Sequence, residues 1–180
     1  MRVAEQIGCD FQDQEPLDYW RQTGAEIDDE RVRIGRDELL EMDYTVEDRK
    51  DGRGRGVYAE RPFAGGELVA VVSGEIVGEH RLHTLQLDAH THLYDPSFTG
   101  CLLHACDPNA IINPSKREVR ALRNIGIGEA ITVDYAHTED RLVRQFACRC
   151  GSPTCRHWIK GRREEINREG LRYLEAFTFH

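Results

Sequence analysis

The feature that most constrains how this chain can fold is a compact group of cysteines near its C-terminal end. Cys148, Cys150 and Cys155 form a Cys-x-Cys-x4-Cys array, and Gly151 and Pro153 bend the chain between them. Thiolates suit zinc, and a structural zinc site takes four ligands in a tetrahedron. The array supplies three ligands, so a fourth must come from another part of the chain.

Several residues are candidates for that fourth ligand. They are Cys9, Cys101, Cys106, His137 and His157. The spacing alone does not choose among them. Clustered thiols without a metal are open to oxidation, so we interpret the array as a metal site and not as free cysteines.

Charge is distributed unevenly along the chain. Of 180 residues, 24 are Lys or Arg and 32 are Asp or Glu, and the net charge is −8. The first fifty residues hold 15 acidic and 7 basic side chains, which accounts for the whole excess. Binding to nucleic-acid phosphates needs a basic surplus, so we expect no direct nucleic-acid partner.

The sequence also lacks membrane and secretion patterns. The longest apolar run, Leu68–Val72, is far shorter than the roughly 20 residues of a membrane-spanning helix. The first ten residues contain Glu5 and Asp10 and do not resemble a secretory signal. We therefore expect a cytoplasmic protein with no membrane partner, a nuclear location staying open, and no disulfide framework.

Short apolar runs separated by glycines indicate a β-rich fold. The runs are Val57–Ala59, Leu68–Val72, Ile76–Val77, Val119–Leu122 and Ile131–Tyr135. Residues 1–43 form an acidic N-terminal extension. Near the other end, Ile166, Leu171, Leu174 and Phe177 share one side of a predicted amphipathic helix.

Four segments in order carry a resemblance to a known family. They are Gly54-Arg55-Gly56-Val57-Tyr58-Ala59, His104-Ala105-Cys106-Asp107-Pro108-Asn109-Ala110, Gly128-Glu129-Ala130-Ile131-Thr132-Val133-Asp134-Tyr135 and the cysteine array. Together they resemble the SET-domain protein lysine methyltransferases that carry a post-SET zinc motif, over roughly residues 44–162.

The resemblance implies a fold that spacing does not show. We expect a mainly β protein of small curved sheets with a pseudoknot, short helices and a zinc-bound post-SET tail. The implied parts are a SET domain over 44–140, a post-SET zinc segment over 141–162 and a C-terminal helix over 163–180. The resemblance also makes Cys106 the fourth ligand of one structural zinc, beside Cys148, Cys150 and Cys155.

The implied activity is methyl transfer from S-adenosylmethionine to the lysine side chain of a protein or peptide. Tyr135 is the expected catalytic residue, and the expected cofactor-binding residues are Gly54, Arg55, Gly56, Tyr94, Leu103, His104 and Trp158. A lysine ammonium has a pKa of about 10.4 and must lose a proton before it can attack. A dry channel lowers that pKa, and a phenol hydroxyl can orient the amine.

Two departures from the family pattern weigh on this prediction. Leu103 stands where the family has an asparagine that helps to hold the cofactor, and Val72 stands where many members have a channel-lining tyrosine. Two other functions therefore stay open: a catalytically weak SET-like binding module, and a methyltransferase of a small amine. We interpret Asn109 as a structural hydrogen-bonding residue, and we assign no function to Cys9 or Cys101. The oligomeric state is left unknown.

Overall fold

The computed structural model describes residues 9–10, 26–28, 31–33 and 43–178, and the chain divides into two units, Met1–Met42 and Asp43–His180. In the first unit, β1 (Cys9–Asp10), β2 (Glu26–Asp28) and β3 (Arg31–Arg33) pair antiparallel in the order β1-β3-β2. The acidic extension that we predict falls largely outside the described residues. Everything below concerns the second unit.

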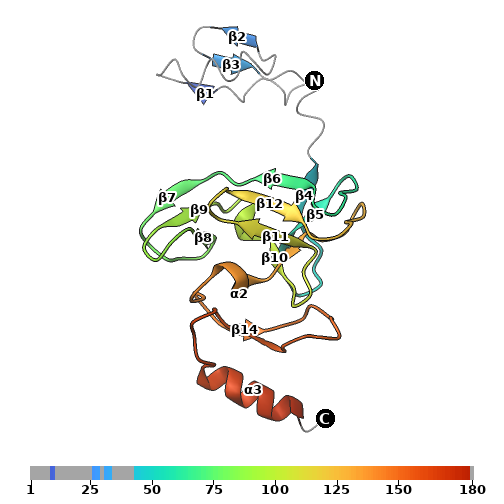
Figure 1. The fold of residues 1–180 in the computed structure, drawn as a ribbon, viewed down its shortest axis with the longest axis vertical. Coiled ribbons are helices and arrows are strands. Elements are labelled where there is room, and N and C mark those ends of the chain that lie inside the picture. The colour runs from blue at the N-terminus through green and yellow to red at the C-terminus, as the bar shows by residue number, and fades with distance from the viewer. Residues whose placement is uncertain (1–8, 11–25, 29–30, 34–42, 179–180) are drawn as a thin grey trace. The chain divides into compact units, whose positions relative to one another are not determined.

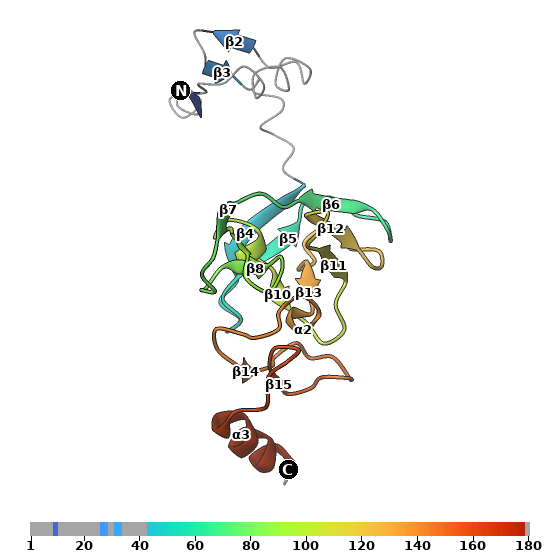
Figure 2. The same ribbon diagram turned by 60° about the vertical axis from the view of Figure 1, so that its left-hand side comes forward.

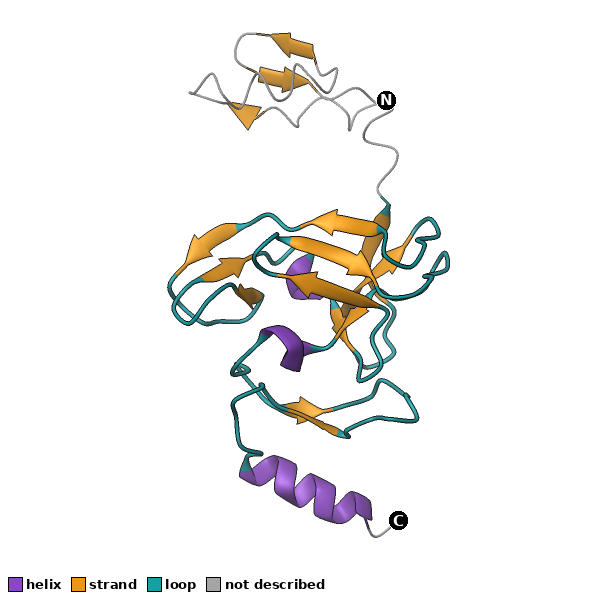
Figure 3. Ribbon diagram, viewed as in Figure 1, coloured by secondary structure: helices purple, strands orange, loops and turns teal. Residues whose placement is uncertain are grey.

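Short strands in several small sheets, joined by loops and turns, form the framework of the second unit, as Figure 3 shows. Strand β4 (Tyr44–Asp48) pairs antiparallel with β5 (Arg55–Ala59). A second sheet has the order β11-β12-β6, and a third has the order β7-β9-β8. Their bounds are β6 (Leu68–Val71), β7 (Glu75–Val77), β8 (Thr84–Gln86), β9 (His92–Tyr94), β11 (Ala110–Asn113) and β12 (Glu118–Ala121). The predicted mainly β class is confirmed.

A parallel pair of very short strands joins two distant segments. Strand β10 (Leu103–His104) lies beside β13 (Thr132–Val133), with His104 opposite Val133. Helix α2 (Tyr135–Thr138) follows β13 directly. Figure 2 shows β10, β13 and α2 close together. The His-x-Cys and Asp-Tyr segments are thus brought together, as the resemblance implies.

The tail continues from α2 through β14 (Phe146–Ala147) and β15 (Trp158–Ile159), which pair antiparallel, to helix α3 (Arg168–Thr178). Figure 1 shows this order along the second unit. One 3-10 turn, η1 (Thr99–Cys101), precedes β10. The helix expected within 163–180 begins at Arg168, because residues 163–167 form a turn and a loop. In the described part of the chain, no helix has the length and apolar character needed to cross a bilayer.

The hydrophobic core lies where the small sheets meet. Val57, Leu93, Val119 and Ile131 are fully buried, and each such side chain stabilises the fold by roughly 1.5–3 kcal/mol. Bridges between strands and loops close the core, including Tyr58 opposite Ala130.

Asn109 braces the connection between β10 and β13 from inside. It is 1 % exposed, and its Oδ1 accepts hydrogen bonds from Thr132 N at 2.7 Å and from Thr132 Oγ1 at 3.1 Å. Its Nδ2 donates to Glu129 Oε1 at 2.9 Å and to the Ala130 carbonyl at 2.8 Å. The interpretation of Asn109 as a structural hydrogen-bonding residue is confirmed.

Candidate active site

Tyr135 is the first residue of α2 and lies at the end of a short buried strand. The helix can begin there because Asp134 caps it, its Oδ1 accepting a hydrogen bond from Ala136 N at 3.0 Å. The Tyr135 hydroxyl donates to the Leu102 carbonyl at 2.6 Å. Burial is the main cause that raises the pKa of Tyr135 to about 12. The phenol is therefore protonated at neutral pH, and its oxygen can still accept a hydrogen bond.

His104 and Phe146 hold the Tyr135 ring in place. Both rings meet Tyr135 edge-on, at centroid distances of 5.3 and 6.0 Å. Tyr135 N donates to His104 Nδ1 at 3.3 Å, and burial lowers the pKa of His104 to about 4. The imidazole is therefore neutral with its proton on Nε2, which lies 3.5 Å from Cys106 Sγ.

Tyr135 lines a cavity of about 340 Å³. Most of the wall is apolar and comes from four parts of the chain: Leu82, Leu85, Ile112, Val133, Leu142, Val143 and Phe146. An apolar wall disfavours a charged group inside the cavity and so lowers the pKa of an entering ammonium. The cavity therefore suits a long aliphatic chain that ends in an amine.

Glu139 also lines this cavity, and sequence reasoning missed it. The residue is 8 % exposed, its Oε1 accepts a hydrogen bond from Gln86 N at 3.1 Å, and its buried Oε2 has no hydrogen-bond partner among the described residues. Burial is the main cause that raises the pKa of Glu139 to about 7. The only sequence signal is its position four residues after Tyr135, which places both at the ends of one helical turn.

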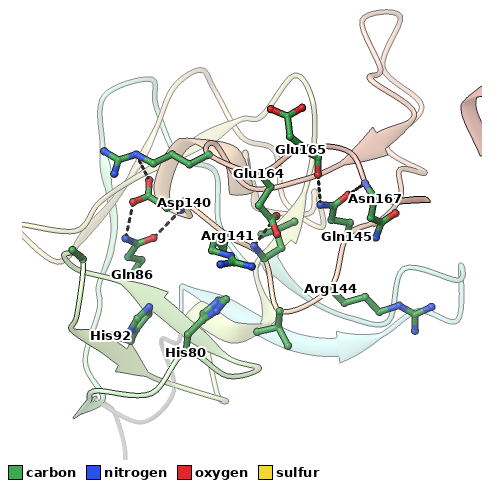
Figure 4. A pocket seen from close by; sticks show the side chains of 14 residues that line it. His80, Gln86, His92, Asp140, Arg141, Arg144, Gln145, Glu164, Glu165 and Asn167 are labelled. Carbon is green, nitrogen blue, oxygen red and sulfur yellow. Dashed lines mark hydrogen bonds and ion pairs between the residues drawn. The ribbon is translucent and has the colours of Figure 1, made fainter. Parts of the chain in front are cut away.

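A second cavity of about 860 Å³ adjoins the first, with His80 and residues 142–144 lining both. Figure 4 shows its polar wall. Gln86 is held there by Asp140, with Gln86 Nε2 donating to Asp140 Oδ2 at 3.1 Å and Asp140 N donating to Gln86 Oε1 at 2.7 Å. The rings of His80 and His92 stack at 5.2 Å. The pair of cavities offers a broad polar approach to a narrower apolar site.

The structure brings Gly56, in β5, beside Leu103, in β10. Gly54 has φ +87°, and a Cβ on it would meet nothing within 4 Å, so its backbone faces open space. A Cβ on Gly56 would stand 2.7 Å from Leu103 Cδ1. The exposed Arg55 begins β5 opposite Asp48.

Tyr58 supplies a further observation at this place. Its hydroxyl is buried without a hydrogen-bond partner among the described residues, 3.0 Å from the position of a Gly56 Cβ. The open backbone of Gly54 and the unpaired buried Tyr58 hydroxyl beside Gly56 together fit a bound polar group such as S-adenosylmethionine. The apolar Leu103 side chain offers no polar contact there.

Two other predicted cofactor residues have different surroundings. Tyr94 lies in β9 opposite Glu75 and Thr84, with the Arg81 guanidinium 4.2 Å above its ring. Trp158 is buried against α3, where its ring lies 5.6 Å from that of Tyr173, and its Nε1 donates to Gln145 Oε1 at 3.0 Å.

Val72 belongs to the hydrophobic core at 2 % exposure and is not among the residues that line the Tyr135 cavity. Val72 therefore does not take the channel-lining place that the family pattern gives to a tyrosine at this cavity, because the wall is built by other segments.

The four predicted metal ligands converge. The sulfurs of Cys106, Cys148, Cys150 and Cys155 all lie within 4.8 Å of one another. Of the described candidates for a fourth ligand, Cys106 joins the array, while Cys101 is buried elsewhere with its thiol donating to the Pro96 carbonyl at 3.3 Å. The side chain of Cys9 lies outside the described residues.

The chemistry of this donor set fits zinc. Burial opposes ionisation of Cys150, but hydrogen bonds from backbone amides and neighbouring thiols lower its pKa overall to about 7. Cys150 can thus ionise to a thiolate near neutral pH, and a bound cation would favour ionisation of the other three thiols. Arg156 ties this tail to the Tyr135 region, since its backbone N donates to Cys106 Sγ at 3.3 Å and its Nη2 lies 2.6 Å from Asp134 Oδ1.

Comparison with known proteins agrees with this geometry. The family model described as the SET domain matches residues 54–136. The chain is 30% identical over 135 residues to the variant-silencing SET domain-containing protein of Plasmodium falciparum, covering 58% of this chain and 5% of that protein. It is 27% identical over 146 residues to the histone-lysine N-methyltransferase trithorax of Drosophila melanogaster, covering 65% of this chain and 4% of that protein.

Solved structures show the same fold. The structure of KRYPTONITE in complex with mCHG DNA and SAH has a TM-score of 0.54 at 21% identity, covering 67% of this chain and 30% of that one. The methyltransferase domain of human SETMAR has a TM-score of 0.53 at 16% identity, covering 68% of this chain and 59% of that one. The second unit therefore has the SET fold, with histone-lysine methyltransferases among its relatives.

Proposed function

We propose that this chain transfers a methyl group from S-adenosylmethionine to the side-chain amine of a lysine in a protein or peptide. The observation that carries the proposal is the buried Tyr135 hydroxyl, hydrogen-bonded to the Leu102 carbonyl at the wall of an apolar cavity of about 340 Å³. When bound, S-adenosylmethionine supplies an electrophilic methyl group. The chain itself must bind, orient and desolvate the amine.

Tyr135 and Leu102 suit the orienting role. The phenol oxygen can accept a hydrogen bond from an amine while it donates its own proton in a hydrogen bond to the Leu102 carbonyl, so the oxygen lone pair is held in a fixed direction. Fixed orientation of two reactants contributes a large part of such a rate enhancement. The apolar wall keeps water away from the amine.

A protein or peptide substrate is favoured over a small amine by the second cavity. Its volume of about 860 Å³ far exceeds what an alkylamine fills, and it adjoins the Tyr135 cavity through His80 and residues 142–144. Residues flanking the target lysine would lie in this polar cavity. The relatives named as histone-lysine N-methyltransferases support the same substrate class.

Gly54, Gly56 and His104 would hold the cofactor, and the four cysteines would hold one zinc ion that ties the tail to this region. The second candidate function is a SET-like binding module with weak catalysis. Leu103 favours it, because its apolar side chain packs on Gly56 where the family pattern has an asparagine. Loss of that polar contact would cost about 1 kcal/mol of cofactor binding.

The test is methyl transfer from labelled S-adenosylmethionine to recombinant histone H3 and to n-butylamine. We expect transfer to the protein, and a loss of at least ~100-fold in Tyr135→Phe, because a misplaced amine costs about that factor. Tyr44→Phe is the matched control. The Tyr44 ring packs on the Phe98 ring at a centroid distance of 4.5 Å, and Tyr44 is not among the residues that line the cavity.

Each other outcome has a separate meaning. Cofactor binding without transfer to any substrate would favour the binding module. Transfer to n-butylamine alone would favour the small-amine enzyme. Transfer that is unchanged in Tyr135→Phe would refute the role given to Tyr135.

A further inference from the structure

We propose that the Glu139 carboxylate receives the ammonium group of the substrate in the Tyr135 cavity and accepts its proton before methyl transfer. The inference rests on the proposed function and adds a residue to it. Its basis is geometric: Glu139 and Tyr135 line the same cavity, and the buried Oε2 of Glu139 has no hydrogen-bond partner among the described residues.

An ammonium group that enters an apolar cavity needs an anionic partner, because burying an unpaired charge is costly. Among the described residues that line the cavity, Glu139 alone carries a carboxylate. The other ionisable groups of the wall are basic or phenolic: His80, Arg81, His83, Arg144 and Tyr135. Only Glu139 therefore offers a charge of the required sign.

The two oxygens of Glu139 have different tasks in this arrangement. Oε1 accepts the Gln86 N hydrogen bond at 3.1 Å, which fixes the carboxylate against β8. Oε2 is buried and has no hydrogen-bond partner among the described residues, so an incoming ammonium would reach it by a movement of the Glu139 side chain toward the cavity. Buried polar atoms normally have partners, and an ammonium proton would supply the one that this oxygen lacks.

Tyr135 cannot replace Glu139 as the proton acceptor. Its hydroxyl proton is held by the Leu102 carbonyl, and its pKa of about 12 describes a group that stays protonated. Tyr135 orients the amine, and Glu139 takes the proton.

The proton transfer is balanced within the site. One N–H bond of the ammonium breaks, its electron pair stays on nitrogen, and the proton bonds to Oε2 to give a neutral carboxylic acid beside a neutral amine. The amine lone pair is then free to attack the methyl group of the sulfonium donor, and the pair of the breaking C–S bond stays on sulfur. The carboxylic acid later returns its proton to water.

The surroundings of Glu139 suit this exchange. Burial is the main cause that raises its pKa to about 7, opposed by hydrogen bonds from Gln86 and Thr138, with smaller effects of Asp140 upward and Arg162 downward, so both protonation states are accessible at neutral pH. An ordinary lysine pKa of about 10.4 would make the transfer unfavourable, but the apolar wall lowers the pKa of the ammonium.

The first experiment does not depend on turnover. The carboxyl-carbon NMR signal of Glu139, identified by its loss in Glu139→Gln, is followed from about pH 5 to 9 in the full chain. We expect a midpoint near 7 that moves lower with n-butylamine and stays in place with 1-butanol, which lacks the charge. A midpoint near the ordinary value, or one that n-butylamine does not move, would overturn the inference.

The second experiment measures kcat/KM against pH with histone H3 and labelled S-adenosylmethionine. Glu139→Gln should lose about 100-fold or more near pH 7, the usual effect of removing an acid–base group. The loss should shrink at higher pH, because more of the substrate amine is then already neutral. Glu60→Gln, an exposed carboxylate on the turn after β5, should change nothing.

A purely structural role for Glu139 would give a different pattern. Glutamine can still accept the Gln86 N hydrogen bond, so a structural role predicts a nearly normal rate and an unchanged pH profile in Glu139→Gln. If the wild type is active and Glu139→Gln shows that pattern, the Glu139 inference is refuted and the proposed function is left intact. A wild type that binds n-butylamine at Glu139 but never transfers methyl would refute the proposed function instead.

Discussion

Replacing Asn109 by alanine tests how the candidate site is held together. The buried Asn109 side chain makes four hydrogen bonds, two accepted from Thr132 and one donated to each of Glu129 and Ala130. Truncation leaves Thr132 N–H and the Ala130 carbonyl without these partners. Each unpaired buried group costs roughly 1–3 kcal/mol, so we expect a loss of about 3–5 kcal/mol in the free energy of unfolding. Glu129 still accepts the hydrogen bond from Arg123 Nη1 at 2.9 Å after the truncation, so it adds little to that loss.

The assay is urea unfolding of the full chain followed by far-UV circular dichroism. Asn113→Ala is the matched control, because the exposed Asn113 side chain bonds only to the local turn at Ser115 and Lys116. Water can replace those bonds, so the control should lose less than ~1 kcal/mol. A loss in Asn109→Ala no larger than that of the control would refute the reasoning.

Three further predictions concern the tail, Glu139 and a close backbone contact. Metal analysis should find about one zinc per chain in the wild type and in Cys101→Ser, but much less in Cys106→Ser; full zinc in Cys106→Ser would contradict the four-sulfur site. The pKa of Glu139 is raised in the folded state from 4.5 to about 7, so its contribution to stability is full below about pH 4.5 and is lost as the pH rises through 7. Relative to Glu139→Gln, the wild type should lose at most about 3 kcal/mol of unfolding free energy over that interval, and a flat difference between the two proteins would argue against a buried carboxylate. Finally, Gly161→Ala would press a Cβ against the backbone of Asp140 and Arg141 and should cost about 1–3 kcal/mol, whereas Gly78→Ala has room; equal melting temperatures would count against this contact.

Sequence alone predicted the parts of the fold that depend on local pattern or on motifs. Short apolar runs between glycines indicated the small sheets, and the cysteine spacing indicated a metal site that needed a fourth ligand. The resemblance pointed to Cys106, and the structure brings its sulfur to the other three. It also pointed to Tyr135, which lies at a cavity wall. The roles of Tyr135, of the zinc site and of the cofactor residues stay predictions.

The rest depended on contacts between distant segments. Glu139 looks in the sequence like an ordinary acid at the end of a short helix, but in the fold it is buried and accepts a hydrogen bond from Gln86 N in the distant strand β8. Val72 was assigned to the channel by alignment with the family pattern, but packing places it in the core. The predicted C-terminal helix began too early because the apolar spacing included Ile166, which precedes the first helical residue, Arg168.

The parallel pairing of β10 with β13 also sets an order of assembly during synthesis. Leu103–His104 leave the ribosome well before Thr132–Val133, and non-local pairs of this kind form slowly. The four-sulfur cluster forms later still, because Cys106 has no partner cysteines until Cys148, Cys150 and Cys155 have been translated. A nascent chain therefore passes through a stage in which the sheets can fold while Cys106 is an unshared thiol and the Phe146 wall is missing. Chains interrupted at that stage would be exposed to oxidation, and the wall of the Tyr135 cavity would be completed only once Phe146 had been translated.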